Sequence, residues 1–467
     1  MSEHFNIQQE KRRFLQRDFP PEEFKERRRK IFEAIGSDAH ALIPGKPAVR
    51  GFHLFRQSNE FYYCCGIEIP HAYLLMSSAE QITKLFIPET SEKRGSEALT
   101  LTLADAELIK EHTGIDEVYP LKALKDHLRE AKLLYVPFSP AEGRSETRYL
   151  LLQANRFISL DPWDGRLPRE QHFIGLLRTR FPQIKIRDLS PILDEMRLVK
   201  SSREIKLLRI AGHLAALAVK EAMRATKPGM MEYQLRAIAN CVYMMYGAWG
   251  EGYRSIIASG RNIWDPHYFL CDCEMRDGDL VLMDSAPEYH YYTSDIGRIW
   301  PVNGTYSSWQ RKLYGFIVEY HKTLLRHIRP GLTADQIMDE AASEMEGVIE
   351  RIKFPKKRYL RAAQQTLKFR GHLSHTVGMS VHDVGDYRSR PLKPGIVFSV
   401  DPQMWIPEER LYIRVEDTVV VTESGIEVLT RSAPLEPDDV EAVMKEKSTF
   451  DTLIRQSAKH FIQKSVK

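Results

Sequence analysis

The most informative stretch of the chain is LVLMDSAPEYHYYTSDIGR, residues 280–298. Its first four residues are apolar and predict a strand that ends on the carboxylate of Asp284. Pro287 and Glu288 suit a turn, and the aromatic and β-branched residues 291–293 predict a second strand that carries Asp295. Such a hairpin would bring the two aspartates side by side, where they repel each other unless a cation, a shared proton or an arginine intervenes. On this window alone, Asp284 could equally cap a turn and Asp295 could be solvated.

Three downstream segments supply further histidines and acids: RGHLSHTVGMSVHD (370–383), FSVDP (398–402) and IRVED (413–417). The second ends an apolar run on an acid, and the third places acids inside a strand-like segment. Taken in order along the chain, the candidate residues are Asp, Asp, His, Asp and Glu. Four carboxylates and one imidazole form a plausible ligand set for two divalent metals that share bridging carboxylates.

These motifs together resemble those of the pita-bread metallopeptidases, and within them the branch of Xaa-Pro aminopeptidases (aminopeptidase P) and prolidases. Asp284 and Asp295 are eleven residues apart, His375 and His382 fit an SH-x6-H-D pattern, and Glu416 lies in an I-R-x-E-D motif. The resemblance covers most of the chain. It implies an α/β (α+β) protein, with an N-terminal creatinase-like α/β domain followed by a C-terminal pita-bread catalytic domain that ends in a helical tail. The implied domain boundaries are 1–192 and 193–467.

The resemblance implies hydrolysis of the bond between an N-terminal residue and a following proline. Carried over position by position, it makes Asp284, Asp295, His375, Asp401 and Glu416 the metal ligands, with Asp295 and Glu416 bridging two ions. The family usually works with manganese, and oxygen-rich ligation with a single histidine suits Mn²⁺. Zn²⁺, Co²⁺ and Fe²⁺ are the alternatives.

Catalytic roles follow from the same resemblance for His267, His382, Asp401 and Arg414. The two histidines match family positions that contact the substrate, and imidazole is suited to proton shuttling near pH 7. Asp401 occupies the position thought to move the proton of the attacking water. Arg414 could pair with Asp295 or a neighbouring carboxylate and steady the acid cluster. Either histidine could instead be structural, and Arg414 could be a surface arginine of a strand.

The chain departs from the family pattern around Asp401. The family has Glu before this proline, so the carboxylate here is one methylene shorter. Gln403 begins a stretch that replaces the small-residue turn common after Glu-Pro. Four positions before the metal histidine the family often has His, whereas this chain has Gly371 there and His372 one step later. We expect His372 to be structural or to support a ligand.

The composition is that of an ordinary globular protein. The 467 residues include 67 basic and 63 acidic side chains, so the net charge of +4 gives no reason to expect nucleic acid or an acidic membrane as a partner. An odd count of five cysteines predicts reduced thiols. No apolar run reaches the ~20 residues that span a bilayer, and the N-terminus lacks the hydrophobic core of a signal peptide. A cytoplasmic location is therefore the default expectation.

Hydrophobic patterning and breakers predict the elements. In the first domain we expect strands at 39–43, 72–76, 84–87, 133–136 and within 184–192, helices at 99–111 and 121–130, and a connector over 138–170. In the second, Ser201 or Ser202 followed by Glu204 begins a helix that ends near Thr226. Further helices are expected at 233–246, 312–327, 333–351 and, in the charged tail, 436–462.

Competing functions remain within and outside the class. A prolidase acting only on Xaa-Pro dipeptides would use the same residues and differ in the loops and subunit contacts that close the channel. A metal-independent, creatinase-like hydrolase would lack most of the acidic ligands, which this chain keeps. A non-catalytic pita-bread binding protein is encouraged only by Asp401. The expected partners are a peptide with proline at its second position and further copies of the chain, as a homodimer or homotetramer.

Overall fold

The computed structural model describes residues 11–48, 54–89 and 100–451. The chain divides into two compact units, Met1–Arg197 and Leu198–Lys467. The division falls in the last turn of helix α8 (Ser190–Leu198), five residues beyond the expected boundary. Among the helices of the described residues, none is both long and apolar enough to cross a bilayer.

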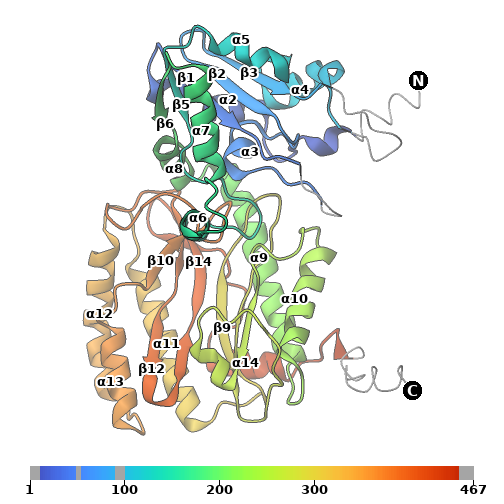
Figure 1. Ribbon diagram of the computed structural model, residues 1–467. Helices are drawn as coiled ribbons and strands as arrows, with labels where there is room; N and C mark the ends of the chain where they lie inside the picture. Colours follow the sequence, from blue (N-terminus) through green and yellow to red (C-terminus); the bar gives the residue numbers. More distant parts are fainter. Residues whose placement is uncertain (1–10, 49–53, 90–99, 452–467) are drawn as a thin grey trace, which may run out of the picture. The chain divides into compact units, whose positions relative to one another are not determined.

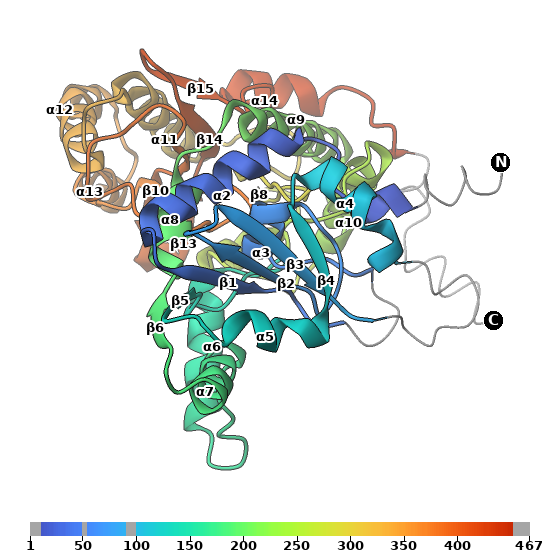
Figure 2. The ribbon, with the colours of Figure 1, turned by 90° about the horizontal axis from the view of Figure 1, so that it is seen from above.

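The first unit is built on a six-stranded mixed sheet with the order β4-β3-β2-β1-β5-β6 (Figure 1). Its strands are β1 (His40–Pro44), β2 (Tyr73–Ser77), β3 (Ile82–Ile87), β4 (Glu117–Pro120), β5 (Leu133–Val136) and β6 (Lys185–Asp188). Its helices, besides α8, are α2 (Pro21–Ile35), α3 (Asn59–Cys65), α4 (Ala106–Thr113), α5 (Leu124–Leu128), α6 (Arg148–Leu160) and α7 (Arg169–Arg180). Apolar residues of α5 and α7 pack on one face of this sheet, and α2 and α3 lie against β1 (Figure 2).

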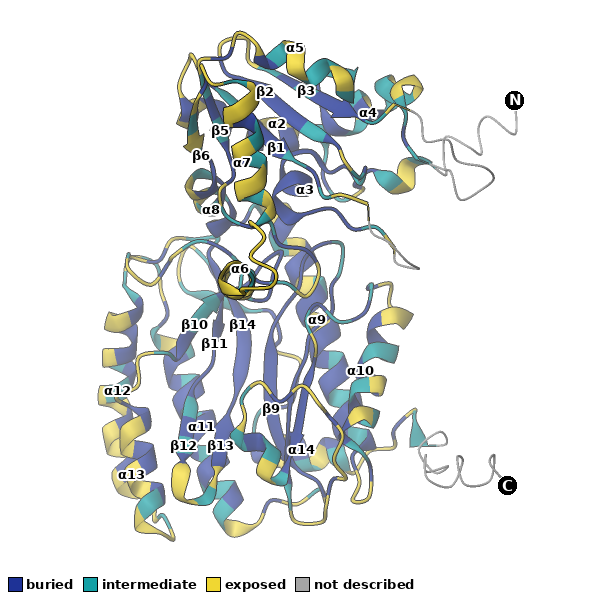
Figure 3. Ribbon diagram, viewed as in Figure 1, coloured by how far each residue is buried: buried dark blue, intermediate teal, exposed yellow. Residues whose placement is uncertain are grey.

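The second unit is built on a seven-stranded antiparallel sheet with the order β10-β11-β14-β9-β8-β7, in which β15 also pairs with β14. Its strands are β7 (Ile256–Ser259), β8 (Leu280–Asp284), β9 (Ile296–Pro301), β10 (Leu373–Thr376), β11 (Val397–Val400), β14 (Glu416–Val421) and β15 (Ile426–Val428). A separate two-stranded hairpin consists of β12 (Gln403–Ile406) and β13 (Leu411–Arg414). Every residue of β7, β8, β9, β11 and β14 is buried (Figure 3).

Within its described residues, this unit has the helices α9 (Ser202–Ala225), α10 (Glu232–Met245), α11 (Ser308–His327), α12 (Ala334–Arg351), α13 (Lys357–Thr366) and α14 (Pro437–Met444). The start of α9 follows from its sequence, because Ser201 and Glu204 cap each other's backbone N–H groups in a capping box. Helix α9 packs beside β9, and α11 packs beside β11 and β13. These helices cover the sheet and bury its largely aliphatic core.

Three expectations about elements were wrong. Residues 291–293 do not form a strand. The backbones of Tyr289 and Tyr292 are joined by two hydrogen bonds across a tight turn, in which His290 and Tyr291 have φ angles of 48° and 73°. The second strand of the hairpin begins only at Ile296, directly after Asp295. The expected connector 138–170 contains α6. The helix expected over 436–462 is shorter: α14 spans Pro437–Met444 and residues 445–450 are not helical, while the part beyond residue 451 lies outside the described residues.

Candidate metal centre

The acids singled out in the sequence meet at one end of the second sheet. Asp284 is the last residue of β8 and Glu416 the first of β14, and both pair in register with Gly297 of β9. Asp295 directly precedes β9, and Asp401 directly follows β11. Because neighbouring strands run antiparallel, the end of one lies beside the start of the next. Residues that are distant in the sequence therefore converge here.

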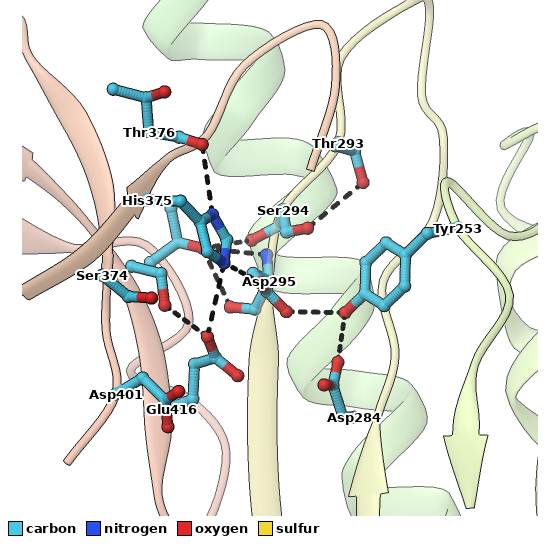
Figure 4. A network of polar contacts seen from close by, with 12 residues as sticks. Tyr253, Asp284, Thr293, Ser294, Asp295, Ser374, His375, Thr376, Asp401 and Glu416 are labelled. Atoms are coloured by element: carbon cyan, nitrogen blue, oxygen red, sulfur yellow. Dashed lines mark hydrogen bonds and ion pairs between the residues drawn. The ribbon is translucent and has the colours of Figure 1, made fainter. Parts of the chain in front are cut away.

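Asp295, His375 and Glu416 direct three ligand atoms toward one another. One such atom from each residue lies within 4.8 Å of the others. His375 Nε2 lies 3.3 Å from Asp295 Oδ2 and 4.0 Å from Glu416 Oε1 (Figure 4). The Ser399 hydroxyl donates to that same oxygen of Glu416 and so orients the carboxylate. Carboxylate oxygens and imidazole nitrogens are common ligands of divalent cations.

Tyr253, which no motif singled out, connects Asp284 to this group. Its hydroxyl oxygen lies 2.6 Å from Asp284 Oδ1 and 2.6 Å from Asp295 Oδ1 (Figure 4). Thr418 fixes Asp295 by its backbone, since the threonine hydroxyl accepts from the Asp295 N–H and donates to the Asp295 carbonyl, both at 2.8 Å. Thr418 stands two residues after Glu416 and so on the same face of β14. That alternation was the one sequence signal for it, and Tyr253 had none.

Arg414 is the cation of the acid cluster. Its Nη2 donates to Asp284 Oδ2 and to Glu416 Oε2, and its Nε lies 3.7 Å from Asp401 Oδ1. Of the two partners considered from the sequence, the neighbouring carboxylates are therefore the ones that it contacts. Gly297 leaves room for the guanidinium, because a Cβ at this position would lie 3.0 Å from Arg414 Nε and 3.0 Å from Glu416 Cβ.

Crowding and burial shift the pKa values of these acids. Burial, reinforced by Asp284, raises the pKa of Asp295 well above its usual range. Burial also raises the pKa of Asp401 and, well above the usual value, that of Glu416, although Arg414 opposes both shifts. Burial lowers the pKa of Arg414, but the charges of Asp401, Glu416 and Asp284 outweigh it and raise that pKa well above its usual value. One guanidinium thus contacts three of the four acids, and further positive charge would stabilise all four.

The residues present fit a divalent metal. The donor set holds four carboxylates and one imidazole, and Asp401 Oδ1 is buried among them without a hydrogen-bond partner. An unpartnered carboxylate oxygen is costly to bury, and a cation would satisfy it. The arrangement can therefore bind divalent ions, and His375 is the most exposed of the five candidate ligands, with 21% of its side chain exposed.

The remaining predicted histidines differ in their surroundings. The His382 ring stacks on the His375 ring at a centroid distance of 3.8 Å, and burial, followed by the charges of His375 and His267, lowers the pKa of His382 to about 2. His267 is exposed, with its ring parallel to that of Phe269. His372 is fully buried, and its Nε2 lies 2.7 Å from the Thr366 carbonyl, which makes it a structural residue.

Comparison with known proteins agrees with this geometry. Residues 206–423 match the model of metallopeptidase family M24, and residues 24–134 match that of the aminopeptidase P N-terminal domain. The chain is 31% identical over 442 residues to the Xaa-Pro aminopeptidase of Escherichia coli K12, an alignment that covers 91% of this chain and 97% of the relative. The chain belongs to metallopeptidase family M24.

Solved structures of the family share the fold. The proline aminopeptidase P II from Yersinia pestis matches with a TM-score of 0.72 at 30% identity, covering 91% of this chain and 99% of its own. Aminopeptidase P from E. coli with the inhibitor Pro-Leu matches with a TM-score of 0.70 at 28% identity, covering 91% and 98%. The family and the fold class inferred from the motifs are thereby confirmed. Membership of this metallopeptidase family implies divalent metal ions at the site.

Proposed function

We propose that this M24 protein is a metal-dependent aminopeptidase that hydrolyses the bond between an N-terminal residue and a following proline. The convergence of five potential ligands around Arg414 carries the proposal. Asp284, Asp295, His375, Asp401 and Glu416 would hold two divalent ions, with Asp295 and Glu416 shared between them. The E. coli relative, an Xaa-Pro aminopeptidase, aligns over nearly the whole chain and supports the same substrate class.

Bound divalent metal supplies Lewis acidity and a water that is nucleophilic near neutral pH. The side chains provide the rest. With metal bound, Asp401 would be the carboxylate that holds the proton released by the attacking water. His382 stays neutral at pH 7, because its pKa is lowered to about 2, so its N–H donates a hydrogen bond to the substrate and not a proton. His267 is exposed, and its imidazole is the group proposed to give a proton to the leaving proline nitrogen.

The decisive experiment compares peptides on the metal-loaded enzyme. Gly-Pro-Ala should be cleaved to glycine and Pro-Ala, and removal of metal with a chelator should abolish the reaction. Glu416→Gln should lower kcat at least about 100-fold, because it removes a bridging ligand. The matched change Glu423→Gln, on an exposed carboxylate, should leave kcat unaltered. A folded, metal-loaded protein that is inert toward every Xaa-Pro peptide would refute the proposal.

A prolidase is the second candidate, since it would use the same ligands. Cleavage of the dipeptide Gly-Pro at a higher kcat/KM than that of Gly-Pro-Ala would favour it. A non-catalytic binding protein would bind the tripeptide and leave it intact.

Manganese is the ion we propose, because the donor set is rich in oxygen and has a single imidazole. Metal analysis of protein purified without added metal tests this choice. A cytoplasmic location and a homo-oligomeric assembly, both expected from the sequence, stay predictions. Size-exclusion chromatography with light scattering measures the assembly.

A further inference from the structure

The fold treats the two carboxylate oxygens of Asp401 differently. Oδ2 accepts a hydrogen bond from the side-chain amide of Gln403. Oδ1 is buried without a hydrogen-bond partner, and it faces Arg414 with 3.7 Å between Oδ1 and Nε. The residue as a whole is only 3% exposed. Oδ2 is therefore held by a hydrogen bond, and Oδ1 faces the acid cluster without one.

Gln403 is held in turn by His372. The Gln403 N–H donates to His372 Nδ1 at 3.3 Å, and the Asp401 N–H donates to the His372 carbonyl at 2.7 Å. His372 Nε2 lies 2.7 Å from the Thr366 carbonyl. A carbonyl can only accept, so the ring proton is on Nε2 and Nδ1 is free to accept from Gln403. His372 thus locks the turn that carries both Asp401 and Gln403.

The β12–β13 hairpin places Gln403 opposite Arg414. The two residues are paired in register at its open end, and Asp401 precedes that end by two residues. The amide of one strand therefore binds Oδ2, while the guanidinium of the other lies beside Oδ1. Such a pair of groups fixes the rotation of a short carboxylate.

We propose that Gln403, locked by His372, is a positioning residue that presents Oδ1 of Asp401 as a single oxygen ligand to the metal site. The inference rests on the function proposed for that site. The family Glu extends one methylene farther and needs no such support, and the small residue common after Glu-Pro carries no amide. The three differences from the family pattern, at Asp401, Gln403 and His372, then belong together: the shorter acid is supported by the other two residues.

The test titrates metal-stripped protein with MnCl₂ by calorimetry, without peptide. Gln403→Met keeps the length of the side chain and removes the amide, and it should weaken Mn²⁺ binding about tenfold. Gln365→Met, on the exposed face of α13, is the matched control and should bind as the wild type does. Gln403→Ala repeats the test if the methionine variant does not fold. Wild-type affinity in a folded Gln403 variant would overturn the inference.

A double-mutant cycle adds a readout that a purely structural role would not move. Asp401→Glu alone should bind Mn²⁺ more weakly, because the longer acid meets the Gln403 amide. Adding Gln403→Gly should restore the affinity, since the longer acid needs no support. If the two substitutions change the Mn²⁺ dissociation constant by independent factors that multiply in the double variant, the inference is overturned. Gln403→Met should also lower kcat and leave KM within about twofold. If Mn²⁺ binding depends on Gln403 but no Xaa-Pro peptide is cleaved, the proposed function fails and the inference stands.

Discussion

Glu416 and Asp417 are neighbours in β14, yet their carboxylates lie in opposite electrostatic settings. Burial raises the pKa of Glu416 well above its usual range, with Arg414 opposing and the nearby aspartates adding to the shift. Burial alone would also raise the pKa of Asp417, but Arg298 and then His321 outweigh it and hold that pKa well below its usual range. Arg298 donates to both Asp417 oxygens, at 2.8 and 3.0 Å, and His321 Nε2 lies 2.8 Å from Oδ2.

The first prediction concerns the metal-free protein. When folding raises the pKa of a carboxyl group, that group does not oppose folding below its unfolded pKa, which is about 4.3 for Glu. As pH rises through the folded pKa, the group lowers the free energy of unfolding. Glu416→Gln removes that cost and should raise the stability of metal-free protein by about 1–2 kcal/mol at pH 8, with a smaller gain at pH 5. Thermal melts at the two pH values measure it. A lower Tm at both would contradict it.

The matched change on the opposite face should behave in the reverse way. Asp417→Asn leaves the buried Arg298 without its anionic partner and should cost about 3–5 kcal/mol at pH 7. Because the folded pKa of Asp417 is depressed, its contribution is present above the unfolded pKa of about 3.9 and is lost as pH falls below it. The gap in Tm between wild type and variant should therefore narrow on acidification below about pH 4.

Spacing in the sequence was enough to identify the residues that converge, but not their supporting contacts. Asp284, Asp295, His375, Asp401 and Glu416 were all chosen from motifs, and the fold brings them together. Tyr253 was not singled out, and Gln403 was noted only as a departure from the family pattern, because their contacts depend on loop and hairpin geometry, which follows no periodicity. Their roles became visible only from the positions of individual oxygens.

At the scale of elements, β9 is the strand that separates the acids of β8 and β14. It lies between β8 and β14, and at Gly297 it pairs with the acids at the ends of both neighbours. Arg414 occupies the space that a side chain at this position would fill. A strand that carries no acid of its own therefore sets the distance between Asp284 and Glu416.

Gly297→Ala tests this role. The added methyl group would press on Arg414 and on Glu416 Cβ, so we expect a loss of about 1–3 kcal/mol in stability and a roughly tenfold weaker Mn²⁺ affinity. Gly347→Ala in α12 is the control: its Cβ would meet no atom within 4 Å, and it should stabilise by about 0.5–1 kcal/mol. Urea melts and metal titrations measure both. Unchanged metal affinity in Gly297→Ala would contradict the assignment.

Long amphipathic helices could be predicted well, because both their period and their caps are local. The helix expected from Ser201 or Ser202 to near Thr226 is α9, and the pair expected at 312–327 and 333–351 corresponds to α11 and α12. Residues 291–293 were misassigned because their strand propensity is overridden by the reversal at His290 and Tyr291. Helix α6 was missed because the flanking Pro and Gly residues gave its segment the composition of a loop.

At the scale of the whole molecule, helix α6 and the loop after it expose an unusual number of large apolar side chains. None of the residues of α6 is buried. Seven large apolar side chains in this segment are at least half exposed: Tyr149, Leu150, Leu152, Phe157, Leu160, Trp163 and Leu167. Together they offer on the order of 700 Å², close to the ~800 Å² that each partner contributes to a stable interface. A second copy of the chain is the occupant that the expected homo-oligomer supplies.

We expect the double change Phe157→Asp and Leu160→Lys to reduce the molar mass of the assembly. Light scattering after size-exclusion chromatography measures it. Because both side chains are exposed, at 73% and 69%, the free energy of unfolding of the chain itself should change by no more than about 0.5 kcal/mol. Arg178→Glu on the exposed side of α7 is the control and should leave the mass unchanged. An assembly unaffected by the double change would place the subunit contact elsewhere.

The Tyr253 hydroxyl between two aspartates has a consequence for metal uptake. The Tyr253 hydroxyl hydrogen lies between two carboxylate oxygens, each 2.6 Å from the hydroxyl oxygen. Burial and the charge of Asp284 also raise the pKa of Asp295 well above its usual range, so without metal this carboxyl favours its protonated form. Loading a cation must expel that proton. The heat of loading then varies with the ionisation enthalpy of the buffer, and the apparent affinity climbs toward alkaline solution.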